Sequence, residues 1–410
     1  MTVLRENTFS KVFGFISRQQ EPFKANLVRT SIQNFFYNLT NQYQPIYMMA
    51  LGANPLELGV INGIGGLAAA AVSTPIGWLV SRYGVRWMYL VGLPIMAFGA
   101  FLFAVAPNWV WLIPAIFVSS LSFRWMVTSC SMVCGSYLKN EERATGMQLC
   151  DTISSIPRIA SPLIAAVVIT IFGGLNEKGI RPLYGLQIIG IAFIFIFVLL
   201  KFEDPLMHGR AYSGGFFESL RIALSKSNRV KAWILFTTLS TLSMFMSSTY
   251  LSVYAADIKN ADQYLLGGMA TAAVVLPLLL SLPIGRLADT FGRKKIILLL
   301  IPLYCLSFVT LLLAQDPLMV IVSGIFQGFS MLIFITENAI AAELVPLESL
   351  GNWLGFLGFF RGLASVGGPV LGGIIWSVFG PSTVLFSLII LELSKLLVLQ
   401  IGIPETLQKH

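Results

Sequence analysis

A few charged side chains lie inside long apolar stretches of the chain, where ordinary surface charges do not occur. Arg124, Arg158 and Arg361 share these stretches with the carboxylates Asp151 and Glu337. A guanidinium presents a planar fork of donors that matches a carboxylate or a phosphate. A carboxylate in apolar surroundings can carry a proton. Together these residues predict a site that binds a small anionic or amphipathic molecule and moves protons.

A structural interpretation competes with this one. Each arginine could instead bond helix-end carbonyls or Asp151. Glu392 and Lys395, three residues apart, are interpreted as a local ion pair on a peripheral helix. The two histidines, His208 and His410, lie outside the apolar stretches. A proton would therefore need a carboxylate, Glu337 first and Asp151 second.

Other kinds of chemistry find no support in the sequence. It contains no phosphate-binding Walker loop, cluster of metal ligands or nucleophile motif. Cys130 and Cys134 share a helical face, but buried thiols on apolar helices are the common case. We expect no enzyme activity, no cofactor and no metal.

The composition places these residues in a membrane. Apolar residues make up 56% of the 410 residues and charged residues 11%, against roughly 45–50% and about 25% in soluble domains. About 20 helical residues cross the hydrocarbon core. We predict an all-α integral membrane fold with twelve transmembrane helices in two pseudo-symmetric halves of six. The predicted spans are 25–51, 56–81, 86–106, 109–137, 143–172, 182–201, 230–257, 263–288, 294–314, 317–344, 349–378 and 382–403.

The distribution of cations sets the predicted orientation. With an even number of spans, both termini lie on one side, and that side holds 19 of the 27 lysines and arginines. The positive-inside rule places that side in the cytoplasm, and we expect the plasma membrane. Since topology accounts for the cations, the net charge of +8 does not indicate nucleic-acid binding.

The spans divide the chain into five parts. These are an N-terminal cytoplasmic segment, 1–24, a six-helix bundle, 25–201, a cytoplasmic linker, 202–229, a second bundle, 230–403, and a tail, 404–410. In the first segment Phe9, Val12 and Ile16 recur at helical spacing. This pattern indicates a short helix on the membrane surface, with a frayed tail as the alternative.

One polar motif occurs in both halves, between consecutive spans. Pro283-Ile-Gly-Arg-Leu-Ala-Asp-Thr-Phe-Gly-Arg-Lys-Lys295 has a weaker copy 208 residues earlier, Pro75-Ile-Gly-Trp-Leu-Val-Ser-Arg-Tyr-Gly-Val-Arg-Trp87. Glycine allows a tight turn, and Asp289 can cap a helix or pair with a nearby cation. Duplication at half the chain length indicates two similar membrane halves.

The run from Gly285 to Lys294 resembles the loop signature of the major facilitator superfamily. The resemblance extends to the twelve spans, the two halves and the long linker. A second resemblance is the exchanger motif Gly368-Pro369-Val-Leu-Gly372-Gly373, with a small-residue analogue at Ser161-Pro162-Leu-Ile-Ala165-Ala166. The first loop departs from the family pattern, with Ser81 in place of the usual aspartate. Because both halves carry the loop motif, we predict a conformational latch formed by Gly77, Arg82, Gly84, Gly285, Asp289, Gly292 and Arg293.

The resemblance implies that spans one, four, seven and ten surround a central cavity. Polar residues at helical spacing on spans one and seven should then face it, or else hydrogen-bond adjacent helices. The predicted substrate-binding residues are Arg124, Arg158, Asn34, Tyr37, Asn38, Asn41, Thr241 and Arg361.

The resulting prediction is a monomeric secondary active transporter working by alternating access. It would move a small organic, anionic or amphipathic solute with proton coupling, in contact with membrane lipids. A broad-specificity drug/proton antiporter is the alternative within transport. A transporter-like receptor without turnover is the alternative from another class.

Overall fold

The structure is a computed structural model that describes residues 14–138, 143–202, 228–343 and 350–402. Within these ranges the regular elements are helices, and no strand is present. The first half contains α2 (Glu21–Asn41), α3 (Gln44–Ala50), α4 (Pro55–Tyr83), α5 (Val85–Val105), the short 3-10 helix η1 (Trp109–Trp111), α6 (Leu112–Tyr137), α7 (Arg143–Ile171) and α8 (Glu177–Lys201). The second half contains α10 (Asn228–Asp257), α11 (Gln263–Phe291), α12 (Arg293–Leu313), α13 (Pro317–Gln327), α14 (Phe329–Glu343), α15 (Leu350–Phe379) and α16 (Pro381–Gly402).

These helices confirm the all-α membrane fold. In the described part of the chain, ten helical stretches are long and apolar enough to cross a membrane. Two predicted spans are not in that set. The first predicted span corresponds to the two helices α2 and α3, and the second corresponds to α4, whose apolar part is Pro55–Ala71. Each predicted span nevertheless coincides with a helix or a pair of helices.

Two predicted spans are broken. The first is interrupted between Asn41 and Gln44, where Pro45 opens α3. Proline has no N–H to donate to the carbonyl of Asn41, four residues before it, so α2 cannot continue. The tenth is interrupted at Gly328, which separates α13 from α14.

The first described segment, which starts at residue 14, packs on the protein. Phe15 is buried and lies in a cluster with Phe23, Leu27, Leu138 and Cys150. Ile16, which belongs to the predicted surface helix, is partly buried against this cluster. Phe9 and Val12 lie outside the described residues.

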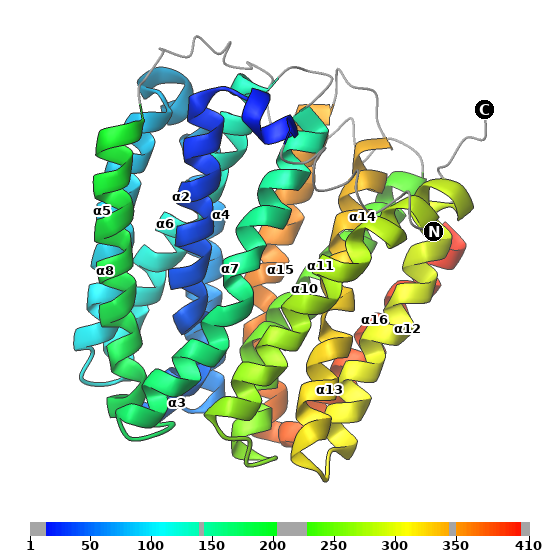
Figure 1. The fold of residues 1–410 in the computed structure, drawn as a ribbon. Coiled ribbons are helices and arrows are strands. Elements are labelled where there is room, and N and C mark those ends of the chain that lie inside the picture. Colours follow the sequence, from blue (N-terminus) through cyan, green and yellow to red (C-terminus); the bar gives the residue numbers. More distant parts are fainter. Residues whose placement is uncertain (1–13, 139–142, 203–227, 344–349, 403–410) are drawn as a thin grey trace, which may run out of the picture.

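The two halves of the chain lie next to each other, with the first half in blue to green and the second in yellow-green to red (Figure 1). They meet where α4 packs against α15 and where α7 packs against α11. We call the end of the bundle where α2 begins the terminal end. The end with the connections near residues 52, 174, 260 and 380 is the far end.

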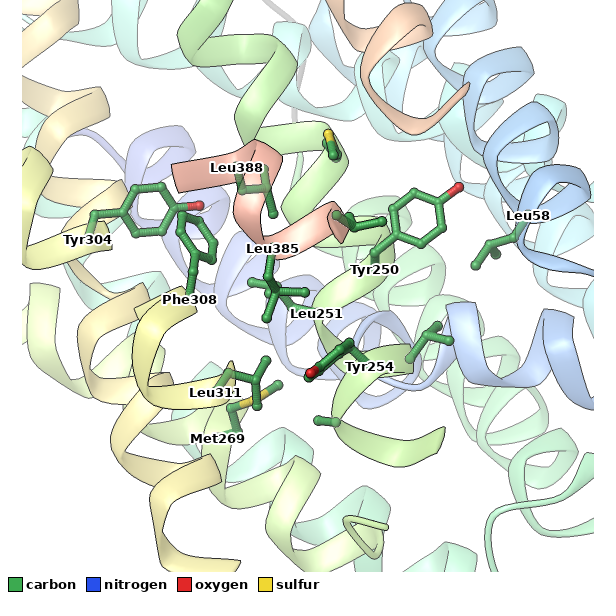
Figure 2. Packing of buried hydrophobic residues seen from close by; sticks show 14 of the residues in the cluster. Leu58, Tyr250, Leu251, Tyr254, Met269, Tyr304, Phe308, Leu311, Leu385 and Leu388 are labelled. Carbon is green, nitrogen blue, oxygen red and sulfur yellow. The ribbon is translucent and has the colours of Figure 1, made fainter. Parts of the chain in front are cut away.

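A large apolar core runs through both halves, and its second-half part is built on α10, α12 and α16. Tyr250 and Tyr254 of α10 pack with Leu385 and Leu388 of α16, while Phe308 of α12 closes the other side (Figure 2). These side chains are at most 2% exposed. The core holds α10, α12 and α16 together, and these three helices position the charged residues described next.

Candidate functional site

A buried cluster of charged and hydroxyl groups joins α10, α14 and α16. Glu337, Glu392 and Lys395 are each at most 2% exposed. Lys395 Nζ lies 2.8 Å from Glu392 Oε2 and donates to Ser240 Oγ at 3.1 Å. Ser240 in turn donates to Glu337 Oε1, and Ser243 donates to Glu392 Oε1 at 2.6 Å. The two carboxylates are thus linked through one lysine and one serine.

A small pocket adjoins this cluster. Thr241 is one of its lining residues, and its hydroxyl donates to the Thr237 carbonyl at 2.9 Å. The lining is Ser240, Thr241, Met244, Tyr304, Ser330, Ile333, Phe334, Glu337, Glu392 and Lys395. It combines charged groups with apolar and aromatic side chains, as small-molecule sites do.

The interpretation of Glu392 and Lys395 needs correction. They form the expected ion pair, but the pair is buried against α10 and does not belong to the periphery. Two opposite charges in the middle of a 22-residue apolar helix are costly unless they face the bundle interior. That cost is the signal in the sequence that could have identified the pair.

Arg361 of α15 lies close to this cluster. Its Nη1 donates to Asn338 Oδ1 at 3.3 Å, and its guanidinium carbon lies 5.9 Å from the centre of the Phe334 ring. The charge of Arg361 acts on Glu337, and Arg124 is near enough for the two like charges to repel. Arg361 is half-buried and Arg124 exposed.

Arg158 lies on α7 close to Tyr37 of α2. The charge of Arg158 acts on the Tyr37 hydroxyl, and its buried Nε has no hydrogen-bond partner among the described residues. Tyr37 stacks on Phe123 with ring centres 4.7 Å apart. An arginine with an unused donor beside an aromatic ring offers a place for an anion.

The predicted asparagines have different surroundings. Asn34 Nδ2 donates to Ser154 Oγ at 3.1 Å, which ties α2 to α7. Asn38 Nδ2 donates to the carbonyl of Asn34 within its own helix at 2.7 Å. Asn41 is exposed at the last residue of α2. For Asn34, the described contact fits the alternative of hydrogen bonding between helices.

The second predicted carboxylate, Asp151, is exposed on α7. Its backbone carbonyl accepts a hydrogen bond from Ser155 at 2.7 Å. The structure therefore does not bring Asp151 into the buried cluster around Glu337.

One buried cation was not selected from the sequence. Arg29 is 1% exposed, and its described hydrogen-bond partners are neutral. It donates to Asn26 Oδ1 at 3.2 Å, to Gln33 Oε1 and to Thr30 Oγ1 at 2.8 Å. Its guanidinium carbon lies 4.2 Å from the centre of the Tyr89 ring. Polar neighbours at helical spacing along α2 were its signal in the sequence.

The repeated loop motif forms two similar turns. Gly84 and Gly292 have φ angles of 80° and 108°, which side chains with a Cβ rarely adopt. Arg293 Nη2 lies 3.4 Å from Asp289 Oδ1 across the second turn. Gly285 lies inside α11 with open space around it. Gly77 and Arg82 lie on α4, where the side chains are outside the described set.

Comparison with known proteins places the chain among transporters. The family model described as Major Facilitator Superfamily matches residues 30–276 and 233–405. A Multi-drug resistance efflux pump PmrA homolog of Lactococcus lactis is 22% identical over 86% of this chain and 88% of its own length. The Staphyloferrin B transporter of Staphylococcus aureus is 28% identical over 34% of this chain and 35% of its own length. An uncharacterized MFS-type transporter of Mycobacterium tuberculosis is 35% identical over 27% of this chain, and the match spans only 15% of that protein.

Solved structures share the fold at low sequence identity. The nucleoside transporter NupG has a TM-score of 0.75 at 14% identity, covering 93% of this chain and 98% of its own. A POT family transporter in complex with 5-aminolevulinic acid has a TM-score of 0.72 at 15% identity, covering 92% and 94%. These similarities establish the arrangement of the helices.

Proposed function

Since the chain belongs to the Major Facilitator Superfamily, we propose that it is a secondary active transporter of a small organic, anionic or amphipathic solute, coupled to protons. Transport by this fold proceeds by rocking two halves about a site near the middle of the membrane. The halves proposed here are 25–201 and 230–403, joined by the linker 202–229. The cation distribution supports termini on the cytoplasmic side.

The arginines support an anionic solute. Arg124 and Arg361 come from different halves and are near enough to repel each other. Arg158 has an unused buried donor. An anion between the halves would relieve this repulsion and occupy the donors. A carboxylate or phosphate group is therefore the chemistry that fits.

One observation carries the proposal of proton coupling: Glu337 is buried, borders the cavity, and is joined through Ser240 to Lys395. Protonation removes the charge of Glu337, so the neutral form passes through a closed, low-dielectric intermediate at lower cost. The hydrogen bond from Ser240 connects that change to the Lys395–Glu392 pair. A proton on Glu337 would thus alter the contacts between α10, α14 and α16.

A broad-specificity drug/proton antiporter is the second candidate. It is favoured by the Lactococcus lactis relative, a multidrug efflux pump homolog that matches most of both chains. The cavity lining also contains Met244, Phe334 and Tyr304, and methionine and aromatic groups suit varied apolar ligands. In this case the two buried carboxylates would attract a lipophilic cation.

Flux measurements with two probes test the proposal. The protein in liposomes receives either radiolabelled salicylate, an amphipathic carboxylate, or ethidium, a lipophilic cation, with and without a pH gradient. Salicylate accumulation driven by the gradient supports the first candidate, and ethidium movement driven by the gradient supports the antiporter. Binding of either probe, seen as thermal stabilisation, without any flux would indicate a receptor. Accumulation of either probe that is the same with and without the pH gradient would contradict proton coupling.

A further inference from the structure

Two buried tyrosines tie the halves together at the far end of the bundle. Tyr43 Oη lies 3.0 Å from the Pro162 carbonyl and 2.8 Å from the Gln263 carbonyl. Tyr250 Oη lies 2.8 Å from the Pro369 carbonyl and 2.9 Å from the Pro55 carbonyl. Each hydroxyl has one proton, which it can donate to either of two carbonyls. One of these carbonyls belongs to its own half and the other to the opposite half.

The two contacts are related by the internal repeat of the chain. Tyr250 follows Tyr43 by 207 residues (250 − 43), and Pro369 follows Pro162 by 207 (369 − 162). Gln263, at the start of α11, follows Pro55, at the start of α4, by 208 (263 − 55). The loop motif repeats at the same interval of 208 residues. The contacts are therefore two copies of one arrangement.

Matching glycines leave room for both hydroxyls. A Cβ on Gly59 would lie 2.6 Å from Tyr250 Oη, and one on Gly267 would lie 3.0 Å from Tyr43 Oη. The Cβ on Gly59 would also lie 2.4 Å from the Pro369 carbonyl oxygen, and the Cβ on Gly267 would lie 2.8 Å from the Pro162 carbonyl oxygen. Gly267 again follows Gly59 by 208 residues (267 − 59). Both sites thus depend on close backbone approach, which small residues permit in membrane helices.

The surrounding contacts also join the halves near this end. Thr271 Oγ1 donates to the Ile159 carbonyl at 3.0 Å, and Gln263 Nε2 donates to Thr170 Oγ1 at 2.8 Å. Both bonds connect α11 with α7. Contacts between helices of the two halves therefore close the far end of the bundle. Among these contacts, the tyrosine hydroxyl bonds are present in two repeat-related copies.

We propose that Tyr43 and Tyr250 are a matched pair of latches that hold the far end closed, and that both must release when the solute site opens to that side. Rocking of the halves separates α4 from α15 and α7 from α11, so each hydroxyl must give up the carbonyl of the opposite half. It keeps the carbonyl of its own half, which lowers the cost of release. The two tyrosines thereby set the balance between the closed and open states of this end. This inference rests on alternating access in this family and not on the proposed solute or on protons.

Hydrogen–deuterium exchange of the full chain in lipid nanodiscs tests the latches without a ligand. The variants are Tyr43→Phe, Tyr250→Phe and the double variant. Each keeps the ring and removes only the hydroxyl. The control is Tyr47→Phe, whose hydroxyl donates at 2.9 Å to the Phe103 carbonyl within the first half. The peptides to follow cover residues 55–66 and 263–271, where exchange reports the open population of the far end.

Each single variant should raise exchange in these peptides roughly two- to threefold, the low end of what one hydrogen bond supplies, because the parental hydroxyl keeps the carbonyl of its own half when the end opens. The double variant should raise it by about the product of the single effects, because both contacts are lost in the same opening and the free energies of distant sites add. The control should leave both peptides at the parental rate. If either single variant exchanged at the parental rate, the proposal of a matched pair would be wrong. This result can be obtained even if the double variant fails to fold. An equal rise in Tyr47→Phe would also overturn it, because any lost tyrosine bond would then loosen the bundle.

Discussion

Lys395 and Glu392 form an ion pair 2.8 Å long on one turn of α16, with 2% and 0% of the two side chains exposed. Both also bond to serines of α10, Lys395 to Ser240 and Glu392 to Ser243. The pair therefore satisfies itself inside the helix bundle and fixes how α16 is rotated against α10. Its nearest charged neighbours include Glu337, so the pair also sets the field around the proposed proton carrier.

Breaking this pair from one side should destabilise the protein strongly. Lys395→Met leaves Glu392 buried without a counter-charge, which costs about 3–5 kcal/mol. The double variant Lys395→Met with Glu392→Gln should recover much of that loss because no charge is left unpaired. Thermal unfolding in detergent measures both. The exposed pair Lys24–Glu21, 3.0 Å long, gives the control, since Lys24→Met should change stability by less than about 1 kcal/mol. Equal losses in the two lysine variants would contradict a role for burial.

Removing the charge of Glu337 should separate coupling from exchange. Glu337→Gln imitates the protonated form permanently, so accumulation driven by a pH gradient should disappear. Counterflow of the same solute should persist, because exchange without net proton movement needs no titration. Both are measured in the same vesicles, with Asp151→Asn as the comparison. Accumulation that still responds to pH in Glu337→Gln would show that another group carries the proton.

The arginine fork should matter more than its charge if the solute carries a carboxylate. Arg124→Lys keeps the charge and loses the bidentate geometry. Loss of a charged hydrogen bond should weaken binding of an anionic ligand roughly ten- to hundredfold. Ligand-induced thermal shifts of the parent, Arg124→Lys and Arg124→Met give the affinities. Parental affinity in Arg124→Met would make Arg124 structural and remove support for an anionic solute.

The turn between α11 and α12 should affect the rate of transport more than the affinity. Asp289 and Arg293 form an exposed pair at 3.4 Å, so Asp289→Asn should change stability by less than about 1 kcal/mol. The turn lies at the ends of α11 and α12, away from the solute site proposed near the middle of the membrane. We therefore expect slower turnover with nearly unchanged solute affinity. Initial rates over a range of solute concentrations separate the two quantities. Glu21→Gln, at another exposed pair, is the matched control and should leave turnover unchanged. A collapse of affinity at normal turnover would rule out a latch at Asp289.

The sequence by itself determined that the chain lies in a lipid bilayer and in what order its helices follow one another. With 56% apolar residues, only a bilayer suits the chain, and segments that cross it must be helical because lipid offers no hydrogen bonds. The repeated motif located the turns at Gly84 and Gly292, since a positive φ favours glycine. Glu337 could be selected because a lone acid in a predicted cavity-lining span is costly.

The tertiary structure alone decided which side of each helix faces protein. Lipid-facing and core-facing surfaces are both apolar in a membrane, so hydropathy carries little information about helix rotation. Leu388, which is fully buried, and Ile390, which is 64% exposed, lie two positions apart on α16 with similar apolarity. The cost of charges in lipid could indicate that Glu392 and Lys395 face the bundle interior, but the sequence could not show that they bond Ser240 and Ser243 of α10. The paired contacts of Tyr43 and Tyr250 with carbonyls of the opposite half depend on where two distant backbones approach each other, which packing determines.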